Sequence, residues 1–328
     1  MMSSKPKVLV VRDGFAKKAI DLLRTRCEVE VAKCSNKDGV ITTQDIVDCA
    51  PGKFSIFCYP RVPITEQVLK AAGPSLKVVG TTSVGYDHVD LISMKKYGVR
   101  LGNTPGILTE TVAEIAVGLI IATTRRFFEA NRAVKTGGWQ EWVPGWMCGR
   151  SLKGSVVGIL GCGSIGTSIA EKLIHFKLSQ LLYTSRSEKP AVKALGGQLV
   201  TVDELMERSD FVVVAAALNE ETKFIVSRER IATMKSNAIL VNIGRGQLVD
   251  QDALVEALRE KRIRGAGLDV MTPEPLPLNH PLNGLDNVLL LPHIGTSTSE
   301  MEEEMAVMTA QNILAVLDGS PMPNEVIF

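Results

Sequence analysis

The chain has 328 residues, of which 45% are hydrophobic and 22% are charged, as in ordinary globular proteins, and this length suggests about two domains. Its 37 basic and 36 acidic residues give a net charge of +1. This near-balance lacks the excess of basic residues that is typical of proteins that bind nucleic acid or an anionic membrane. The six cysteines form no C-x-x-C pair and have no histidine at metal-ligand spacing, so we expect reduced thiols and no metal site.

The start of the chain and its most apolar helix carry no targeting or membrane signal. Residues 1–7 lead directly into a strand, without the apolar core and cleavage site of a secretory signal. The most apolar helix, Val112–Ala122, is too short to span a bilayer and carries Glu114. We therefore expect a cytoplasmic protein without a membrane partner.

Residues 7–103 alternate short apolar strands with segments of helical periodicity. Strands are expected at Val8–Val11, Val29–Val31, Ser55–Phe57, Val78–Gly80 and Val99–Leu101. Helices are expected near Ala16–Arg24, Thr43–Cys49, Thr65–Ala71 and Val89–Tyr97. This alternation is typical of a parallel α/β sheet, which binds ligands beyond the carboxyl ends of its strands.

A polar loop, Thr82–His88, follows one of these strands. Gly85 and the free N–H groups of such a loop are suited to hold a carboxylate; the alternative is an ordinary turn before a helix. The region has no phosphate-binding loop, so we assign residues 1–104 to a substrate domain. The last helix, Ser299–Leu317, is expected to return to it, which adds residues 296–328 and leaves residues 105–295 as a dinucleotide-binding domain.

The segment after the Asn103–Gly106 break contains two helices and an aromatic loop. The first helix opens with Thr109 as its N-cap and reaches about Thr123, and the second continues through Lys135. The loop 137–146 then carries all three tryptophans of the chain. Long aromatic-rich loops more often pack against another surface than extend into solvent, which favours an oligomer interface.

The chain is organised around an apolar strand, Val156–Leu160, that runs into G-x-G-x-x-G and then into a helix, Thr167–Phe176. Gly161 permits a tight turn, Gly163 lets the backbone approach a pyrophosphate, and Gly166 lets helix and strand pack closely. The N–H groups at the helix start attract the phosphates. The flanking strand and helix favour a dinucleotide site over a chance glycine-rich turn.

The next strand, Leu181–Tyr183, ends where an NAD site would place an acidic residue for the ribose hydroxyls. This chain has Thr184 and Ser185 there, followed by Arg186 and Lys189. Hydroxyls and cations suit the 2′-phosphate of NADP(H), which an acidic side chain would repel. We therefore expect NADP(H) in preference to NAD(H); the alternative is a solvated polar loop.

The second half continues the alternation of strands and helices. Strands are expected at Phe211–Ala215, Ile239–Asn242, Gly265–Asp269 and Val288–Leu291, and helices near Val202–Glu207, Ser227–Met234 and Asp252–Lys261. Three polar residues, Arg245, Glu274 and His293, each follow one of the last three strands. Taken alone, each residue has a structural explanation: Arg245 as a surface charge, Glu274 as a solvated loop acid and His293 as a hydrogen-bonded strand-end histidine. Because the carboxyl ends of parallel strands meet at one edge, their joint placement favours a single cleft.

These three side chains meet the requirements for reducing a 2-oxo acid by hydride transfer. Arg245 is always charged and binds a carboxylate through two parallel bonds, and it is also suited to polarise the carbonyl. His293 changes its charge near neutral pH and is suited to protonate the oxygen as a general acid. Glu274, if bonded to the far ring nitrogen, would fix the tautomer and favour the protonated imidazole.

Several motifs together resemble the D-2-hydroxyacid dehydrogenase family over essentially the whole chain. They are Ser83–His88, Gly137–Trp139, Trp146–Gly149, Gly161–Gly166, Tyr183–Arg186, Asn242–Gly246, Pro273–Pro277, Pro292–Gly295 and Pro321–Glu325. Within the family, the similarity is greatest to members that reduce glyoxylate and hydroxypyruvate. The resemblance implies an α/β fold of two doubly wound parallel-sheet domains, a Rossmann-like cofactor domain inserted in a flavodoxin-like substrate domain. It also implies a homodimer that reduces these small 2-oxo acids to glycolate and D-glycerate with NADPH.

The resemblance assigns roles to individual positions. The implied catalytic residues are Arg245, Glu274 and His293. The implied substrate-binding residues are Val84, Gly85, Arg245, Asp269, His293, Thr296 and, from the neighbouring subunit, Trp142. The implied cofactor-binding residues are Gly161, Gly163, Ser164, Ile165, Gly166, Ser185, Arg186, Ser187, Lys189, Ala217, Ile243 and Gly295.

Three positions depart from the family pattern without removing a catalytic group. Ser164 replaces a frequent arginine and so removes one phosphate contact. Lys177 replaces a helix-ending glycine, and a left-handed lysine there costs about 1 kcal/mol. Gly244 replaces a serine before the catalytic arginine, which loosens that loop.

The competing interpretations share the fold. A 3-phosphoglycerate dehydrogenase often carries an extra regulatory domain, for which this chain ends too soon. A formate dehydrogenase would use NAD on a substrate without a 2-oxo group. A nucleotide-sensing, corepressor-like binding protein is the alternative outside the enzymes, but the chain lacks extended disordered tails and a basic face.

Overall fold

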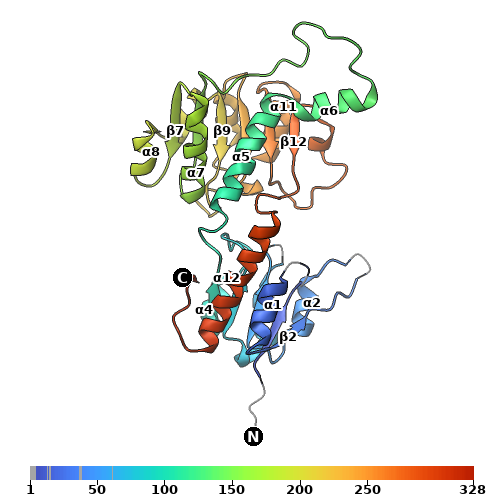
Figure 1. Ribbon diagram of the computed structural model, residues 1–328, viewed down its shortest axis with the longest axis vertical. Helices are drawn as coiled ribbons and strands as arrows, with labels where there is room; N and C mark the ends of the chain where they lie inside the picture. The colour runs from blue at the N-terminus through green and yellow to red at the C-terminus, as the bar shows by residue number, and fades with distance from the viewer. Residues whose placement is uncertain (1–4, 13, 15, 37–38, 61) are drawn as a thin grey trace. The chain divides into compact units, whose positions relative to one another are not determined.

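The computed structural model describes residues 5–328 except 13, 15, 37, 38 and 61, so part of the N-terminal stretch considered for a secretory signal lies outside the described residues. The chain forms two α/β units (Figure 1). The first unit comprises the residues up to Leu108 together with Thr296–Phe328, and the second unit comprises Thr109–Gly295. Each is built on a sheet dominated by parallel strands, which confirms the fold class expected from the sequence.

The first unit contains a six-stranded sheet in the order β13-β5-β4-β3-β1-β2. Its strands are β1 (Lys7–Val10), β2 (Glu28–Val31), β3 (Ser55–Cys58), β4 (Val78–Thr81), β5 (Arg100–Gly102) and β13 (Glu325–Val326). Its helices are α1 (Lys17–Arg24), α2 (Thr43–Cys49), α3 (Glu66–Ala72), α4 (Leu91–Tyr97) and α12 (Ser299–Leu317), with a 3-10 turn at Gly73–Ser75. All neighbouring strands are parallel except β13, which runs antiparallel to β5.

Helices cover both faces of this sheet, so its central strands β3 and β4 are fully buried and largely apolar, whereas the edge strand β2 is partly exposed. Val8 and Val10 share one core with residues of α1 and α12, whereas Leu9 belongs to the core beneath α2, α3 and α4. The C-terminal helix α12 lies beside α1 (Figure 1). It approaches β4 so closely that a Cβ on Gly80 would lie 2.7 Å from the Thr309 methyl group. The last long helix is thus an integral part of the first unit.

The second unit contains a seven-stranded parallel sheet in the order β12-β11-β10-β9-β6-β7-β8. Its strands are β6 (Val156–Leu160), β7 (Gln180–Thr184), β8 (Gln198–Leu199), β9 (Phe211–Val214), β10 (Ile239–Asn242), β11 (Gly265–Leu268) and β12 (Val288–Leu290). Its helices are α5 (Thr109–Thr124), α6 (Phe127–Thr136), α7 (Ser164–Leu173), α8 (Pro190–Ala194), α9 (Val202–Arg208), α10 (Arg228–Thr233) and α11 (Gln251–Arg259), with 3-10 turns at Ile174–Phe176, Gly246–Leu248 and Pro281–Gly284.

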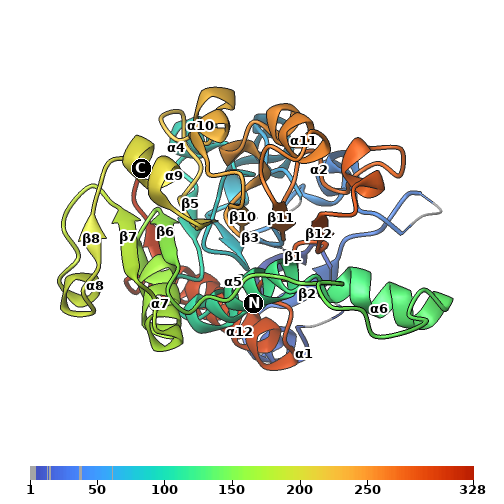
Figure 2. The same ribbon diagram turned by 90° about the horizontal axis from the view of Figure 1, so that it is seen from above.

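Within the second unit, α5 and α7 cover one face of the sheet, and α9, α10 and α11 cover the other (Figure 2). The strand order reverses on either side of β6, because β7 and β9 are its two neighbours. Ligands of open parallel sheets bind at such a reversal, beyond the carboxyl ends of the strands. The G-x-G-x-x-G motif follows β6 and therefore lies at this point.

The structure differs from the sequence-based expectations in several short elements. Helix α7 begins at Ser164, three residues before the expected start at Thr167, so its first turn includes half of the glycine motif. Helix α8 and the two-residue strands β8 and β13 were not expected. Lys177 does adopt the left-handed conformation, with φ 57° and ψ 52°.

None of the helices in the described part of the chain combines the length and the apolar surface needed to cross a bilayer. Among the same residues, no three His, Cys, Asp or Glu side chains are grouped in a way that would hold a metal ion.

Candidate active site

Each glycine of the G-x-G-x-x-G motif satisfies a different constraint. Gly161 has φ +94°, and a Cβ there would lie 2.5 Å from the Ala216 backbone nitrogen. A Cβ on Gly166 would lie 2.6 Å from the Gly161 carbonyl oxygen, so only glycine lets α7 pack this closely on β6. A Cβ on Gly163 would meet no atom within 4 Å and would occupy the open space at the N-terminus of α7.

The N-terminus of α7 has no side-chain cap. By contrast, Thr201 and Asp250 accept hydrogen bonds from first-turn N–H groups of α9 and α11. The first-turn N–H groups of Ser164 and Ile165 therefore remain available to an external acceptor, at the positive end of the helix dipole. Together with the open space at Gly163, this arrangement fits the pyrophosphate of a dinucleotide.

The end of β7 is fastened to the glycine motif. The Gly161 N–H donates to Thr184 Oγ1 at 3.0 Å, and the Cys162 N–H donates to the Thr184 carbonyl at 2.8 Å. The buried Tyr183 hydroxyl accepts from the Lys189 N–H at 3.0 Å, which turns residues 184–189 back toward the strand. The loop that would contact the adenosine end of a cofactor is thus fixed next to the pyrophosphate loop.

The loop 184–189 carries two cations, Arg186 and Lys189, and one carboxylate. Arg186 and Ser187 are exposed, Ser185 is half-buried, and the loop's carboxylate, Glu188, pairs with Lys193 at 3.0 Å outside the turn. Burial raises the pKa of the Cys162 thiol, and the Thr167 hydroxyl and the nearby Lys189 ammonium offset part of that rise. The Lys189 charge therefore acts on the glycine motif itself.

Arg245 lies in the loop after β10, and a buried asparagine shapes that loop. Asn242 Nδ2 donates to the Arg245 carbonyl at 2.9 Å, and Asn242 Oδ1 accepts from the Gly244 N–H at 3.1 Å. A Cβ on Gly244 would lie 2.9 Å from the Ala216 carbonyl oxygen and 2.7 Å from a Leu248 methyl group. The expectation that glycine loosens this loop is thus incomplete, because a serine here would require the loop to shift.

The arginine loop packs directly on the loop that carries Glu274. A Cβ on Gly246 would lie 2.2 Å from the Met271 carbonyl carbon and 2.4 Å from Thr272 Oγ1. Gln251, the first residue of α11, accepts from the Thr272 N–H at 2.8 Å and donates to the Thr272 carbonyl. These contacts leave little freedom between the two loops.

Glu274 and His293 form a hydrogen-bonded pair. Since a carboxylate only accepts, His293 Nδ1 donates to Glu274 Oε2 at 2.8 Å. The other carboxylate oxygen of Glu274 accepts from the Met271 N–H at 3.0 Å. The side chains of His293 and Glu274 are 26% and 21% exposed, so the pair is partly accessible. The bond on Nδ1 leaves Nε2 as the ring atom that can exchange a proton with a ligand.

The backbone at His293 is held by a buried aspartate. His293 has φ 57°, a left-handed conformation that is uncommon for a residue with a Cβ. The next two N–H groups, of Ile294 and Gly295, donate to Asp269 at 2.8 and 2.9 Å. Asp269 thus joins the end of β11 to the histidine loop, and its hydrogen bonds are those of a positioning residue.

The remaining cofactor candidates of the second unit also follow strand ends. Ile243 is buried directly after β10, and its N–H donates to the Val214 carbonyl of β9 at 3.1 Å. Ala217 lies three residues beyond β9, where its carbonyl accepts from the Thr222 hydroxyl at 2.7 Å. The structure thus places the catalytic and cofactor candidates of the second unit along the carboxyl edge of its sheet.

The Val84–Gly85 candidate site belongs to the first unit, in the loop after β4. The Ser83 carbonyl accepts from the Thr104 N–H at 2.9 Å, and the Val84 carbonyl accepts from Asn103 Nδ2 at 2.9 Å. In the described part of the chain, the N–H groups of Val84 and Gly85 have no protein acceptor. A loop with its carbonyls bonded inward and its N–H groups left over is suited to an anion.

Thr296 and Trp142 are the last two substrate candidates. Thr296 begins the C-terminal part of the first unit, and its carbonyl accepts from the Thr298 N–H at 2.8 Å. Trp142 lies in the loop that projects beyond α6 in the second unit (Figure 1), and it is 79% exposed.

Three positioning residues were not identified from the sequence. Gln251, Asn103 and Thr104 each hold a candidate loop through one or two hydrogen bonds. Polar residues of this kind are common at helix starts and in turns, so no local signal distinguishes them.

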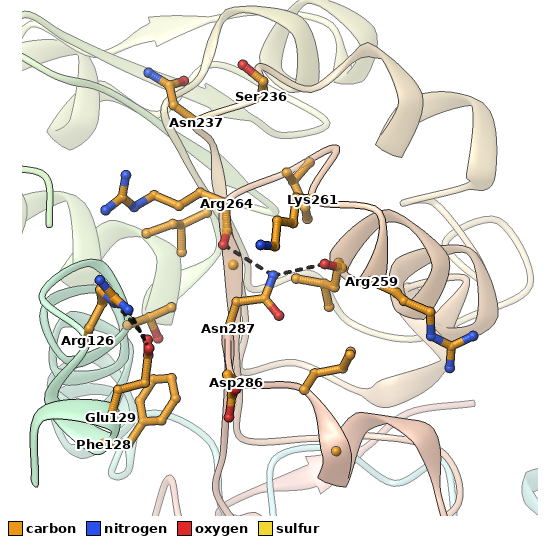
Figure 3. Close-up of a pocket in the computed structure, with 17 residues that line it drawn as sticks. Arg126, Phe128, Glu129, Ser236, Asn237, Arg259, Lys261, Arg264, Asp286 and Asn287 are labelled. Carbon is orange, nitrogen blue, oxygen red and sulfur yellow. Dashed lines mark hydrogen bonds and ion pairs between the residues drawn. The ribbon is translucent and has the colours of Figure 1, made fainter. Parts of the chain in front are cut away.

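A cavity of about 650 Å³ lies at the opposite, amino edge of the second unit's sheet (Figure 3). Several cations line it, but they do not converge on one point. Arg126 pairs with Glu129 at 2.6 Å, Arg264 donates to the Cys148 carbonyl at 2.7 Å, and the Arg259 and Arg264 side chains extend in opposite directions. The cavity contains none of the residues singled out from the sequence, and we assign it no ligand.

Comparison with known proteins agrees with this geometry. Residues 117–295 match the family described as D-isomer specific 2-hydroxyacid dehydrogenase, NAD binding domain. The glyoxylate reductase/hydroxypyruvate reductase of Homo sapiens is 42% identical over 321 residues, 97% of each chain, and the glyoxylate reductase of Thermofilum pendens is 39% identical over 98% of this chain and 94% of its own.

Solved structures superpose over nearly the whole chain. A protein from Thermus thermophilus has a TM-score of 0.90 and 38% identity over 98% of this chain and 100% of its own. The NADPH-dependent glyoxylate/hydroxypyruvate reductase of Sinorhizobium meliloti, solved with NADP and malonate, has a TM-score of 0.85 and 28% identity over 98% of this chain and 97% of its own.

Proposed function

The chain belongs to the D-isomer specific 2-hydroxyacid dehydrogenase family, and on this premise we propose that it reduces glyoxylate and hydroxypyruvate to glycolate and D-glycerate with NADPH. The observation that carries the proposal is the hydrogen-bonded Glu274–His293 pair, packed through the Met271–Thr272 loop against the loop of Arg245. An acid with a fixed tautomer beside a permanent cation is what reduction of a 2-oxo acid requires.

In the proposed mechanism, Arg245 binds the substrate carboxylate. The N–H groups of Val84 and Gly85, in the first unit, are proposed as substrate-binding groups. The guanidinium also polarises the carbonyl that is to be reduced, because it carries a positive charge. Bound NADPH supplies the hydride. His293 Nε2 delivers a proton to the carbonyl oxygen, while the Nδ1–H bond to Glu274 holds the ring in the required orientation.

The preference for NADP(H) rests on the charge around the end of β7. Residues 184–187 contain no carboxylate, and Glu188 is engaged by Lys193. Arg186 and Lys189 therefore face no competing anion within the turn, which suits a 2′-phosphate. The similar reductase from Sinorhizobium meliloti is itself named as NADPH-dependent.

The proposed assembly is a homodimer. Trp139, Trp142 and Trp146 are 55%, 79% and 40% exposed on one projecting loop, and the nearby α6 exposes Phe127 and Val134. Such a concentration of exposed aromatic residues is characteristic of an interface. Light scattering on the purified chain should give twice the monomer mass; a monomer at micromolar concentration would contradict the proposal.

A spectrophotometric assay with both acids and both cofactors tests the proposed activity. NADPH oxidation should depend on glyoxylate or hydroxypyruvate and should be slower with NADH at equal concentration. Binding of NADPH without turnover of either acid would instead favour a nucleotide-sensing module. A cytoplasmic location is part of the same proposal, and microscopy of a fluorescent fusion checks it.

A further inference from the structure

A chain of buried and partly buried hydrogen bonds runs through the segment 81–88, which contains the Val84–Gly85 loop. Ser83 Oγ lies 2.7 Å from the Gly85 carbonyl oxygen and 3.0 Å from Thr81 Oγ1, which in turn lies 3.1 Å from His88 Nε2. Thr81 is fully buried and Ser83 is 7% exposed. We propose that Thr81, Ser83 and His88 form a relay that positions the carboxylate-binding loop, with the His88 proton on Nε2. The relay acts on the substrate of the proposed function, and so it rests on that function.

The number of protons fixes the direction of every bond in the relay. A carbonyl oxygen only accepts, so Ser83 must donate its single hydroxyl proton to Gly85. Ser83 then has only lone pairs for Thr81, so Thr81 must donate to Ser83. Thr81 in turn has only lone pairs for His88, so His88 Nε2 must carry a proton and donate it. Only one arrangement of hydrogens satisfies all three contacts.

The relay completes a pattern in which successive carbonyls are bonded inward. The partners of the Ser83, Val84 and Gly85 carbonyls are the Thr104 N–H, Asn103 Nδ2 and Ser83 Oγ. All three partner residues are buried. In a planar trans peptide the N–H points away from the carbonyl of the same peptide group. The bonded carbonyls therefore turn the N–H groups of Val84, Gly85 and Tyr86 outward.

The relay holds the third of these carbonyls, that of Gly85. The Ser83 and Val84 carbonyls are held by residues beyond β5, whereas the Gly85 carbonyl is held by the relay alone among the described residues. Without the relay, the peptide between Gly85 and Tyr86 is free to rotate. Its oxygen would then turn outward, where it would repel a carboxylate. His88 itself is anchored independently, since its carbonyl accepts from the Ile64 N–H at 2.9 Å.

Two conservative substitutions remove the relay without adding volume. Ser83→Ala and Thr81→Val should each raise KM for glyoxylate and hydroxypyruvate roughly 3–10-fold, the range expected for one buried hydrogen bond. KM for NADPH and kcat should stay within about 2-fold, because the relay does not touch the cofactor or the reacting atoms. His88→Leu should behave like Ser83→Ala, whereas His88→Gln should restore KM to within about 2-fold, since its amide places an N–H where Nε2 stands.

Thr65→Val is the matched control. Its buried hydroxyl has no partner among the described residues, and it belongs to the same unit as the relay. This variant removes a threonine hydroxyl as Thr81→Val does, but it should leave both KM values unchanged. Equal KM shifts in Thr65→Val and Thr81→Val would show a general packing effect and overturn the relay.

A second readout requires no activity. The chain has four histidines, so the ¹⁵N signals of His88 are identified by their loss in His88→Gln. Nε2 should give the shift of a protonated nitrogen; an unprotonated Nε2 in the folded wild type would overturn the relay, whether or not any variant folds.

The kinetic outcomes separate the relay from the proposed function. An active wild type with an unchanged oxo-acid KM in folded Ser83→Ala and Thr81→Val overturns the relay and leaves the function intact. A wild type that turns over neither acid overturns the function and the substrate role of the loop, while the Nε2 signal still decides the direction of the hydrogen bonds.

Discussion

The contact between Gly246 and the Met271–Thr272 loop leads to the sharpest prediction, for Gly246→Ala. This substitution adds one methyl group between the loop of Arg245 and the loop of Glu274. The Cβ would lie 2.2 Å from the Met271 carbonyl carbon and 2.3 Å from its oxygen, which are backbone atoms that cannot turn aside. The two loops must therefore separate.

The size of the effect follows from these distances. Ordinary contact for a Cβ begins at 3.4 Å, so the loops must move apart by about 1.2 Å from an approach of 2.2 Å. A displacement of about 1 Å between catalytic groups costs about 10²-fold in rate. Overpacking also destabilises a fold by about 1–3 kcal/mol. We expect kcat with glyoxylate to fall about 100-fold.

Steady-state kinetics and denaturant unfolding measure these effects. KM for NADPH should change little in Gly246→Ala, because the pyrophosphate loop lies after β6. Gly163→Ala should show the reverse, with a raised KM for NADPH and unchanged stability, since its Cβ meets no protein atom within 4 Å. Gly284→Ala, which also meets no atom within 4 Å, is the neutral control.

A folded Gly246→Ala enzyme with kcat near that of the Gly284→Ala control would refute this reasoning. It would mean either that the loops separate without disturbing the Glu274–His293 pair or that this pair has no part in turnover.

Three further predictions concern the cofactor, the backbone and the response to acid. Ser185→Asp should lower the ratio of kcat/KM for NADPH to that for NADH by roughly tenfold or more, since charge repulsion near the 2′-phosphate amounts to about 1–4 kcal/mol; an unchanged ratio would place the 2′-position elsewhere. Lys177→Gly should raise the free energy of unfolding by about 0.5–1 kcal/mol in urea titrations, because it relieves a left-handed lysine; a loss of stability would mean that the lysine side chain contributes more than the strain. Hydrogen bonds from Ser35 and Thr42 lower the pKa of the Asp45 carboxyl to about 2, so its contribution to stability is complete above pH ~4 and disappears as pH falls through about 2. Asp45→Asn should accordingly be less stable than the wild type at pH 7, with a gap that closes between pH 4 and pH 2; a gap independent of pH would contradict the assignment.

Most strands of the two sheets could be predicted from the sequence, because burial on both faces of a strand favours a continuous apolar run. The runs at Val78–Gly80 and Val156–Leu160 correspond to β4 and β6 with at most one residue of difference. The helix start was placed three residues too late, because apolar periodicity marks the buried face of α7, whereas its first turn from Ser164 is part of the glycine motif. Strand β13 was missed because two edge residues carry no periodic signal.

The candidate site residues could be proposed from the sequence, but the contacts that hold them could not. The Glu274–His293 hydrogen bond was expected from the residue types, and the structure contains it at 2.8 Å. The narrow approach of Gly246 to Met271 was not foreseen, because it depends on two loops separated by more than twenty residues. The relay from His88 was hidden for a different reason, since nothing in a run of Thr, Ser and His distinguishes a hydrogen-bond chain from a polar turn.

The central claim is that His293 delivers the proton while Arg245 holds the 2-oxo acid. Its most direct test is steady-state NADPH oxidation with glyoxylate in wild type and His293→Ala at equal concentrations of folded enzyme. The account predicts turnover by the wild type, a kcat about 10²–10⁴-fold lower in His293→Ala, and an unchanged affinity for NADPH. Turnover by His293→Ala within a few fold of the wild type would contradict the account.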